Sequence, residues 1–182
     1  LNHATRQTAT WNVSSPVYLN PIANATVDED NAATINLSAF TFGPGNFTYT
    51  ATTDNDQVTA AVSSNALTLT GAANYFGSTV VSVIASEPAS GETDAVNTSI
   101  PSTFTLTINS VNDAPEIATI ADATIAEDAT FELTIPATDV EDQAALTFIT
   151  GGAAQFTSTV SEGVLTVTPD ANWNGSGAVS LI

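Results

Sequence analysis

The sequence has almost no basic residues. Its 182 residues include 19 acidic side chains but no lysine, one arginine (Arg6) and one histidine (His3), which gives a formal net charge of −18. Because proteins bind phosphate groups mainly through Lys and Arg, this composition excludes nucleic acid and anionic membrane surfaces as partners. It also excludes lysine Schiff bases and lysine–asparagine isopeptide cross-links. A histidine base is not expected, since His3 lies close to the first residue.

Cysteine and long apolar runs are also absent. Without cysteine the chain cannot form disulfides, thiol nucleophiles or zinc–thiolate sites. No run of about 18 apolar residues occurs, so we expect no membrane insertion. The chain begins at Leu1 without a basic and apolar leader, which indicates a processed mature chain or a piece of a longer one. Carboxylate pairs such as Glu141 and Asp142 fall in predicted turns, so no enzyme is expected.

Polar and apolar residues alternate with a period of two along much of the chain. Residues 103–108 (TFTLTI) and 164–168 (VLTVT) are clear examples, and their β-branched side chains suit a pleated, half-buried surface. Turn signals such as residues 43–45 (GPG) and 54–56 (DND) separate these runs. Many short strands with regular turns predict an all-β sandwich fold.

The chain contains an internal repeat. Residues 22–30 (IANATVDED) match residues 120–128 (IADATIAED), and 120 − 22 gives an offset of 98. Two further pairs of segments match at the same offset: 67–70 with 165–168, and 74–77 with 172–175. Matches along the whole unit without a net gap indicate two copies of one domain.

The two copies differ at their last strand. The first copy continues to a strand at residues 103–109, whereas the match of the second copy extends to residues 179–182. Residues 8–13 (TATWNV) resemble residues 103–108, with Ala9, Trp11 and Val13 at the inward positions. We therefore predict an N-terminal donor strand and linker, an immunoglobulin-like domain 1, and an incomplete domain 2 without its last strand, at residues 1–18, 19–112 and 113–182.

The spare strand is expected to complete a domain of another chain. The linker at residues 14–20 reaches at most roughly 25 Å, less than the length of about 40 Å expected of one sandwich from strand rise. The strand of one chain would then add to the open sheet edge of the next, and such head-to-tail contacts propagate as a filament. The alternative is that the sequence is a window cut from a longer tandem array.

Several motifs resemble one protein family. Residues 111–115 (VNDAP) form a linker, and acidic turns follow at residues 127–128, 137–142 (ATDVED) and 168–170. With residues 172–175 (NWNG), these motifs resemble the bacterial cadherin-like, immunoglobulin-like tandem repeats of large surface adhesins. The resemblance covers nearly all of the chain beyond residue 20. It implies seven-stranded sandwiches strung end to end, often stiffened by calcium, that act as stalks, spacers or adhesive modules on cell surfaces or secreted enzymes.

Acidic residues are expected to gather where the two domains join. Calcium is bound by six to eight oxygens from carboxylates, amides and backbone carbonyls. The candidate ligands lie in the linker and in the turns expected to face it: Glu29, Asp30, Asn112, Asp113, Asp139, Glu141 and Asp142. The alternative is that they are solvated turn residues. The corresponding loop of domain 1, residues 41–44, has no acid, so the junction upstream of domain 1 is expected to be apolar and without calcium.

Six sequons are candidates for glycosylation: Asn12, Asn24, Asn36, Asn46, Asn97 and Asn174. Trp173 aligns with Tyr75, which favours a structural role over a sugar-binding one.

These observations predict a structural subunit of an extracellular filament or surface stalk, whose partners are copies of itself. The alternative is an adhesin excerpt or a carbohydrate-binding accessory module of a secreted enzyme, with surface glycans as partners.

Overall fold

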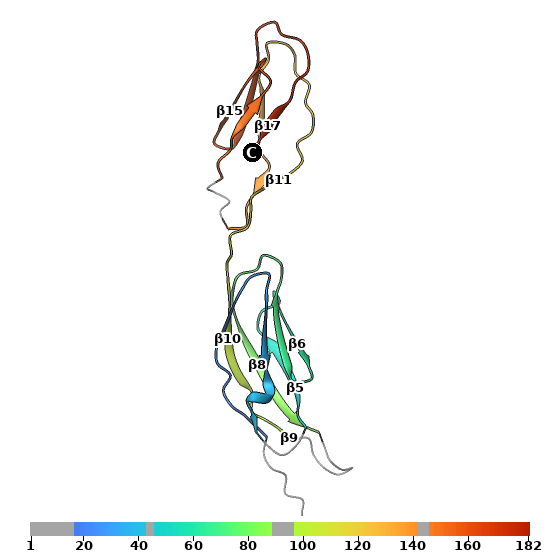
Figure 1. Ribbon diagram of the computed structural model, residues 1–182, viewed down its shortest axis with the longest axis vertical. Coiled ribbons are helices and arrows are strands. Elements are labelled where there is room, and N and C mark those ends of the chain that lie inside the picture. The colour runs from blue at the N-terminus through green and yellow to red at the C-terminus, as the bar shows by residue number, and fades with distance from the viewer. Residues whose placement is uncertain (1–16, 43–45, 89–96, 142–145) are drawn as a thin grey trace, which may run out of the picture. The chain divides into compact units, whose positions relative to one another are not determined.

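A computed structural model describes residues 17–42, 46–88, 97–141 and 146–182. The chain divides into two compact units, with Val111 the last residue of unit 1 and Asn112 the first of unit 2 (Figure 1). Both units are all-β, which confirms the fold class predicted from the period-two alternation. The predicted donor strand lies outside the described residues. The helix described, η1 (Leu37–Ala39), is far too short to cross a membrane, and no other described segment is a helix that could do so.

Unit 1 is a sandwich of two sheets. Its strands are β1 (Tyr18–Leu19), β2 (Ala25–Asp28), β3 (Ala32–Asn36), β4 (Thr41–Phe42), β5 (Thr48–Thr53), β6 (Val58–Ser63), β7 (Ala66–Gly71), β8 (Gly77–Glu87), β9 (Asn97–Thr98) and β10 (Ser102–Asn109). One sheet has the order β2-β10-β8-β5, with β9 also paired to β8, and the other has the order β3-β7-β6. β1 and β4 form a separate two-stranded ribbon.

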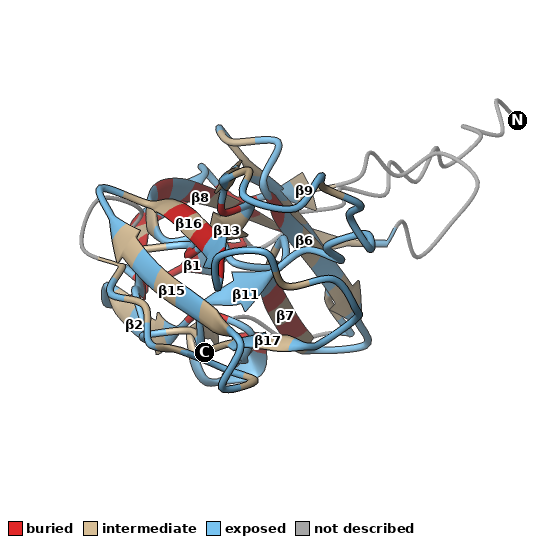
Figure 2. Ribbon diagram, turned by 90° about the horizontal axis from the view of Figure 1, so that it is seen from above, coloured by how far each residue is buried: buried red, intermediate tan, exposed pale blue. Residues whose placement is uncertain are grey.

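β10 lies at the centre of this architecture. It pairs antiparallel with β8 on one side and parallel with β2 on the other. It therefore connects these two strands within one sheet. Its alternating sequence directs Phe104, Leu106 and Ile108 into the core, where each is at most 4% exposed. Between the two sheets these side chains pack with the residues of β7 and β8, which Figure 2 colours as buried.

Unit 2 has the same plan with fewer strands. They are β11 (Glu116–Ile117), β12 (Phe131–Thr134), β13 (Ala137–Thr138), β14 (Thr150–Gly152), β15 (Phe156–Ser161), β16 (Val164–Pro169) and β17 (Val179–Leu181). One sheet has the order β12-β16-β15, and two pairs, β14-β17 and β11-β13, complete the unit. Its buried apolar core consists of Ile135, Leu165 and Val167.

The backbone of unit 2 repeats that of unit 1 at its turns. Asp30 and Asp128 have φ of 60° and 62°, and Asn74 and Asn172 both have φ of 57°. These residues occupy the same positions of the two sequence repeats. Because non-glycine residues rarely adopt positive φ, the shared values show that both copies use the same turns.

Three strands of unit 1, β2, β9 and β10, have no counterpart in the described part of unit 2. No strand there occupies the position of β10, so β17 pairs with β14 and with nothing on its other side. Residues 123–126, which align with β2, are not a strand. β2 is a strand because it pairs in parallel with β10, and residues 123–126 have no such partner in the described part of unit 2. Among the described residues, the sheet that contains β17 therefore ends at β17 on this side.

Candidate functional site

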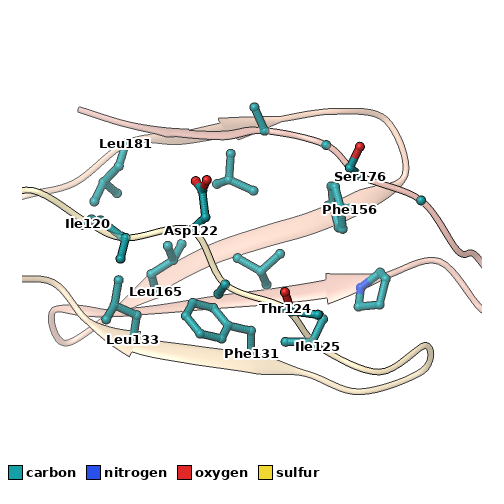
Figure 3. Close-up of a pocket in the computed structure, with 18 of the residues that line it drawn as sticks. Ile120, Asp122, Thr124, Ile125, Phe131, Leu133, Phe156, Leu165, Ser176 and Leu181 are labelled. Atoms are coloured by element: carbon teal, nitrogen blue, oxygen red, sulfur yellow. The ribbon is translucent and has the colours of Figure 1, made fainter.

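An open groove lined by both apolar and polar residues runs through unit 2, at the position that corresponds to β10 of unit 1. Its volume is about 960 Å³. The segment at residues 118–126 forms one wall and the chain from Trp173 to Leu181 forms the other (Figure 3). Core side chains, among them Phe131, Leu133 and Leu165, line the groove between these walls. The groove is thus the unfilled half of a sandwich core.

The exposure of matching residues shows what the groove lacks. Ile22 is 5% exposed in unit 1, but Ile120, its counterpart, is 38% exposed. Val81 is fully buried in β8, beside β10, whereas its counterpart Val179 is only partly buried. Exposed apolar surface of this kind is typical of a site that another chain segment covers.

The groove also presents an unpaired strand edge. In unit 1 the edge of β8 pairs with β10 over seven residue pairs, from Ser102↔Val83 to Ile108↔Gly77. The corresponding edge of β17 has no strand beside it among the described residues. An open edge next to a groove offers both backbone hydrogen bonds and side-chain pockets to an added strand.

Trp173 closes one end of the groove. Its ring meets Phe156 edge to face, with ring centroids 4.9 Å apart and an interplanar angle of 79°. It also lies over Gly175, where an added Cβ would come within 2.7 Å of the Trp173 Cζ2 atom. Tyr75 lies over Gly77 in the same way in unit 1. This supports the structural role predicted for Trp173 from its alignment with Tyr75.

The predicted calcium ligands of unit 1 point to different partners. Glu29 is 3% exposed, and its Oε1 accepts a 2.7 Å hydrogen bond from the Val111 backbone N–H. Its Oε2 is buried and has no hydrogen-bond partner among the described residues. The neighbouring Asp30 is exposed, and its Oδ1 accepts a hydrogen bond from the Asn74 N–H instead. Of the two, only Glu29 has a buried oxygen that a cation could satisfy.

Unit 2 brings three of its predicted ligands together. Glu141 Oε2 accepts a 3.0 Å hydrogen bond from the Asp113 N–H, and Asp139 Oδ1 accepts one of 3.0 Å from the Glu141 N–H. Asp139 is 6% exposed, and Glu141 Oε1 is buried without a hydrogen-bond partner in the described part of the chain. The Asn112 side chain donates to the Asp113 carbonyl, and Asp142 lies outside the described residues.

The described residues include no lysine, arginine or histidine. Arg6 and His3, the basic side chains of the sequence, both precede the first described residue. Within the described ranges, no group of three or more acidic or histidine side chains could hold a metal ion. The carboxylate oxygens of Glu29 and Glu141 are hard ligands of the kind that calcium prefers. Burying a carboxylate oxygen without a partner is costly, and a bound cation would reduce that cost. The remaining ligands of such an ion would be further oxygens.

Of the other predicted site residues, Asn174 lines the groove, and the rest lie away from it or outside the described part of the chain. The donor-strand anchors Ala9, Trp11 and Val13 and the sequon residue Asn12 belong to residues 1–16, which are not described. Among the remaining sequons, Asn24, Asn36, Asn46 and Asn174 are exposed, and Asn97 is half-buried. Asn36 Oδ1 caps η1 by accepting from the Ser38 N–H.

Asp122 is a groove residue that the sequence did not single out. It is exposed and lines the groove. Figure 3 shows its carboxylate pointing away from residues 118–126, toward the segment that carries Ser176 and Leu181. The repeat alignment pairs Asp122 with Asn24. Only the folded structure shows that this position lies next to β10 in unit 1, so the alignment alone did not indicate a role for Asp122.

Comparison with known proteins identifies the second unit and the fold. The sequence model of the bacterial Ig domain family matches residues 112–181. No curated protein matches the chain. Among solved structures, extracellular cadherin domains 3–6 of protocadherin gamma B2 align with 91% of the chain, at 12% identity and a TM-score of 0.51. The human desmocollin-1 ectodomain aligns with 92% of it, at 14% identity and a TM-score of 0.50.

This chain spans 46% and 40% of the lengths of those two cadherin chains. At such identities the likeness shows the fold alone. Together with the match to residues 112–181, it confirms the resemblance read from the linker and turn motifs. Residues 112–181 match the bacterial Ig domain family, and the fold of the chain is similar to that of cadherin domains.

Proposed function

We propose that this protein is a structural subunit of an extracellular filament or surface stalk. In it, the N-terminal strand of one copy fills the groove of unit 2 in the next copy. The observation that carries this proposal is the groove of about 960 Å³ beside the edge of β17, which pairs with no strand on that side among the described residues. The bacterial Ig domain match and the cadherin-like fold support an extracellular structural role.

Residues 8–13 are the occupant that the sequence favours. Aligned with β10, they place Ala9, Trp11 and Val13 where Phe104, Leu106 and Ile108 are buried in unit 1. Burying a large apolar side chain contributes roughly 1.5–3 kcal/mol each. Backbone pairing with β17 adds to this, while ordering of the segment opposes it.

A deletion variant and an anchor variant test this proposal. The full chain should form filaments visible by electron microscopy, and light scattering should show masses above that of one subunit. A chain without residues 1–16, and a Trp11→Ser chain, should both remain monomeric. Tyr18→Ser is a matched control, because this aromatic side chain is exposed outside the groove and should leave assembly through the groove in place.

Assembly that persists after residues 1–16 are removed would refute strand donation. A full chain that stays monomeric and whose native form carries further residues after Ile182 would favour the alternative of a longer array, in which following residues fill the groove. A monomer that binds glycans on an array would favour the accessory-module alternative.

Calcium is the second part of the proposal. Glu29 in unit 1, and Glu141 with Asp113 and Asp139 in unit 2, are the residues that would bind it. The buried oxygens Glu29 Oε2 and Glu141 Oε1 support this, since no Lys, Arg or His follows residue 6 to neutralise them. That all of these acids share a single calcium site stays a prediction. Calcium bound there would stiffen the loops that carry these side chains.

A further inference from the structure

We infer that Asp122 is the anchor that holds the backbone of the donor strand, by accepting the N–H of Thr10 from a second copy. This inference rests on the proposed strand donation. It assigns a binding residue on the acceptor and a single backbone group on the donor. Both follow from how unit 1 holds its own last strand.

In unit 1 the residue at the position of Asp122 makes this bond. Asn24 Oδ1 accepts a 2.9 Å hydrogen bond from the backbone N–H of Thr105 in β10. The parallel pairing of β2 with β10 starts at the next residue of each strand, with Ala25 opposite Leu106. The Asn24 side chain therefore binds the strand where its ladder with β2 begins.

In unit 2 the same position carries a carboxylate that faces open space. Asp122 aligns with Asn24 in the repeat, and it lines the groove. Its side chain points across the groove toward the segment that bears Ser176 and Leu181 (Figure 3). A strand between these two walls would pass directly over the carboxylate. Aligning residues 8–13 with residues 103–108 places Thr10 at the position of Thr105.

The other acid of the groove cannot replace it. Glu127 lines the groove too, and it aligns with Glu29, which accepts the N–H of Val111 in unit 1. The same alignment of the donor places Pro16 at the position of Val111. Proline has no N–H to donate. Asp122 is therefore the groove carboxylate that the aligned donor can reach with a backbone donor.

The change from Asn24 to Asp122 suits a strand that comes from another molecule. A carboxylate only accepts hydrogen bonds, and bonds to a charged acceptor are about twice as strong as neutral ones. A slip of the donor by one residue would turn the N–H groups away from Asp122 and expose Trp11. Asp122 thus stabilises the register in which Ala9, Trp11 and Val13 face the core.

A double-mutant cycle with a synthetic donor tests the inference. The acceptor is the chain without residues 1–16, which cannot donate to itself. The donor is a labelled peptide of residues 1–16, and a second peptide has an ester in place of the Thr10 amide, so that the N–H is absent. Binding of both peptides is measured by fluorescence anisotropy to the Asp122, Asp122→Ala and Asp122→Asn acceptors. Glu132→Ala removes one negative charge from the exposed side of β12 and is the matched control.

The ester should weaken binding to the Asp122 acceptor about tenfold, as expected for loss of a hydrogen bond to a charged group. Asp122→Ala should weaken binding of the amide peptide by a similar factor, and the additional effect of the ester should then disappear. Asp122→Asn should stay within about threefold of the parent acceptor, because Asn24 makes the same bond.

The outcomes separate the two proposals. If the amide peptide binds but Asp122→Ala has no more effect than Glu132→Ala, or the ester acts equally on both acceptors, the role of Asp122 is refuted and strand donation stands. If neither peptide binds the folded parent acceptor, strand donation is refuted and the role of Asp122 with it. Circular dichroism of each acceptor shows that it is folded.

Discussion

Asp128 Oδ1 accepts a 2.8 Å hydrogen bond from the backbone N–H of Asn172, and one repeat earlier Asp30 Oδ1 accepts the same bond from Asn74 at 3.3 Å. Both aspartates and both asparagines adopt positive φ. The bond therefore ties two strained turns together at corresponding places in the two units. It gives Asp30 a structural role, whether or not it also contributes to calcium binding.

Replacing this aspartate should destabilise its unit. Asp128→Ala removes the hydrogen bond and puts a side chain that disfavours positive φ into the turn, which should cost about 1–2 kcal/mol. Asp128→Asn keeps an acceptor and tolerates the turn, so it should cost less than half of that. Urea unfolding followed by Trp173 fluorescence, in a Trp11→Phe background, measures both. Equal effects of the two substitutions would contradict this role.

Calcium should stabilise the chain through Glu29 and Glu141, each of which has one buried carboxylate oxygen. At a calcium concentration of 100 times Kd, binding stabilises the folded state by about 2.7 kcal/mol. Differential scanning calorimetry in calcium and in chelator should show this as a rise in Tm. Glu29→Gln and Glu141→Gln should each reduce the rise, since each replaces a carboxylate that has a buried, unsatisfied oxygen.

Glu132→Gln is the control for charge, because Glu132 is exposed on β12. It should leave the calcium response unchanged. A calorimetric titration without heat, together with a Tm that chelator does not alter, would show that these acids bind no calcium.

Gly175 should tolerate no side chain. Its φ is 157°, and an added Cβ would lie 2.7 Å from Cζ2 of the Trp173 ring, which packs on Phe156. Gly175→Ala should therefore destabilise unit 2 by about 1–3 kcal/mol through displacement of the ring. Gly163→Ala is the matched control, because Gly163 has φ of 75° but nothing within 4 Å of the added Cβ. It should cost about 1 kcal/mol from backbone strain alone.

Thermal unfolding and the near-ultraviolet circular dichroism of Trp173 measure this difference. The prediction fails if Gly163→Ala destabilises unit 2 as much as Gly175→Ala does.

Unit 1 should lose a stabilising contribution from Asp54 in acid. The Thr79 hydroxyl and the Val80 N–H, which donate to Asp54 Oδ1 at 2.7 and 2.8 Å, lower the pKa of this carboxyl below 3.8. A lowered pKa means that the folded state favours the charged form. The stabilisation is therefore fully present above pH 3.8 and is lost as the pH falls through the folded-state pKa.

Thr79→Val tests this dependence, since valine fills the same space without a hydroxyl. The difference in unfolding free energy between parent and variant should be constant near neutral pH and shrink as the pH falls below 3.8. Asp54→Asn should abolish the pH dependence of that difference. A difference that stays constant down to strongly acidic pH would contradict the assignment.

The repeat made much of the fold predictable from sequence. Segments such as residues 22–30 and 120–128 share a pattern of apolar, turn and acidic residues, and the structure gives them equivalent turns at Asp30 and Asp128. The alternation in residues 103–108 likewise predicted a strand with one buried face, which β10 has. These features depend on residues close together in the sequence, so they could be predicted without the tertiary structure.

The candidate site was predictable only in part. The acids Asp113, Asp139 and Glu141 were expected to lie together, and hydrogen bonds join them in unit 2. Asp122 was overlooked, because an acid in an irregular segment has no distinctive pattern. Its position matters only through the strand that its counterpart Asn24 binds in unit 1.

The sequence by itself determined the β-strand composition, the two repeats and the scarcity of cations. Tertiary structure alone decided which groups depend on a strand at the position of β10. Without a strand at the position of β10, residues 123–126 lose their parallel partner, Ile120 becomes exposed, and Asp122 faces an open groove. The physical reason is that β10 makes contacts with both β2 and β8, which lie far apart in the sequence, so only the folded chain shows which groups depend on it.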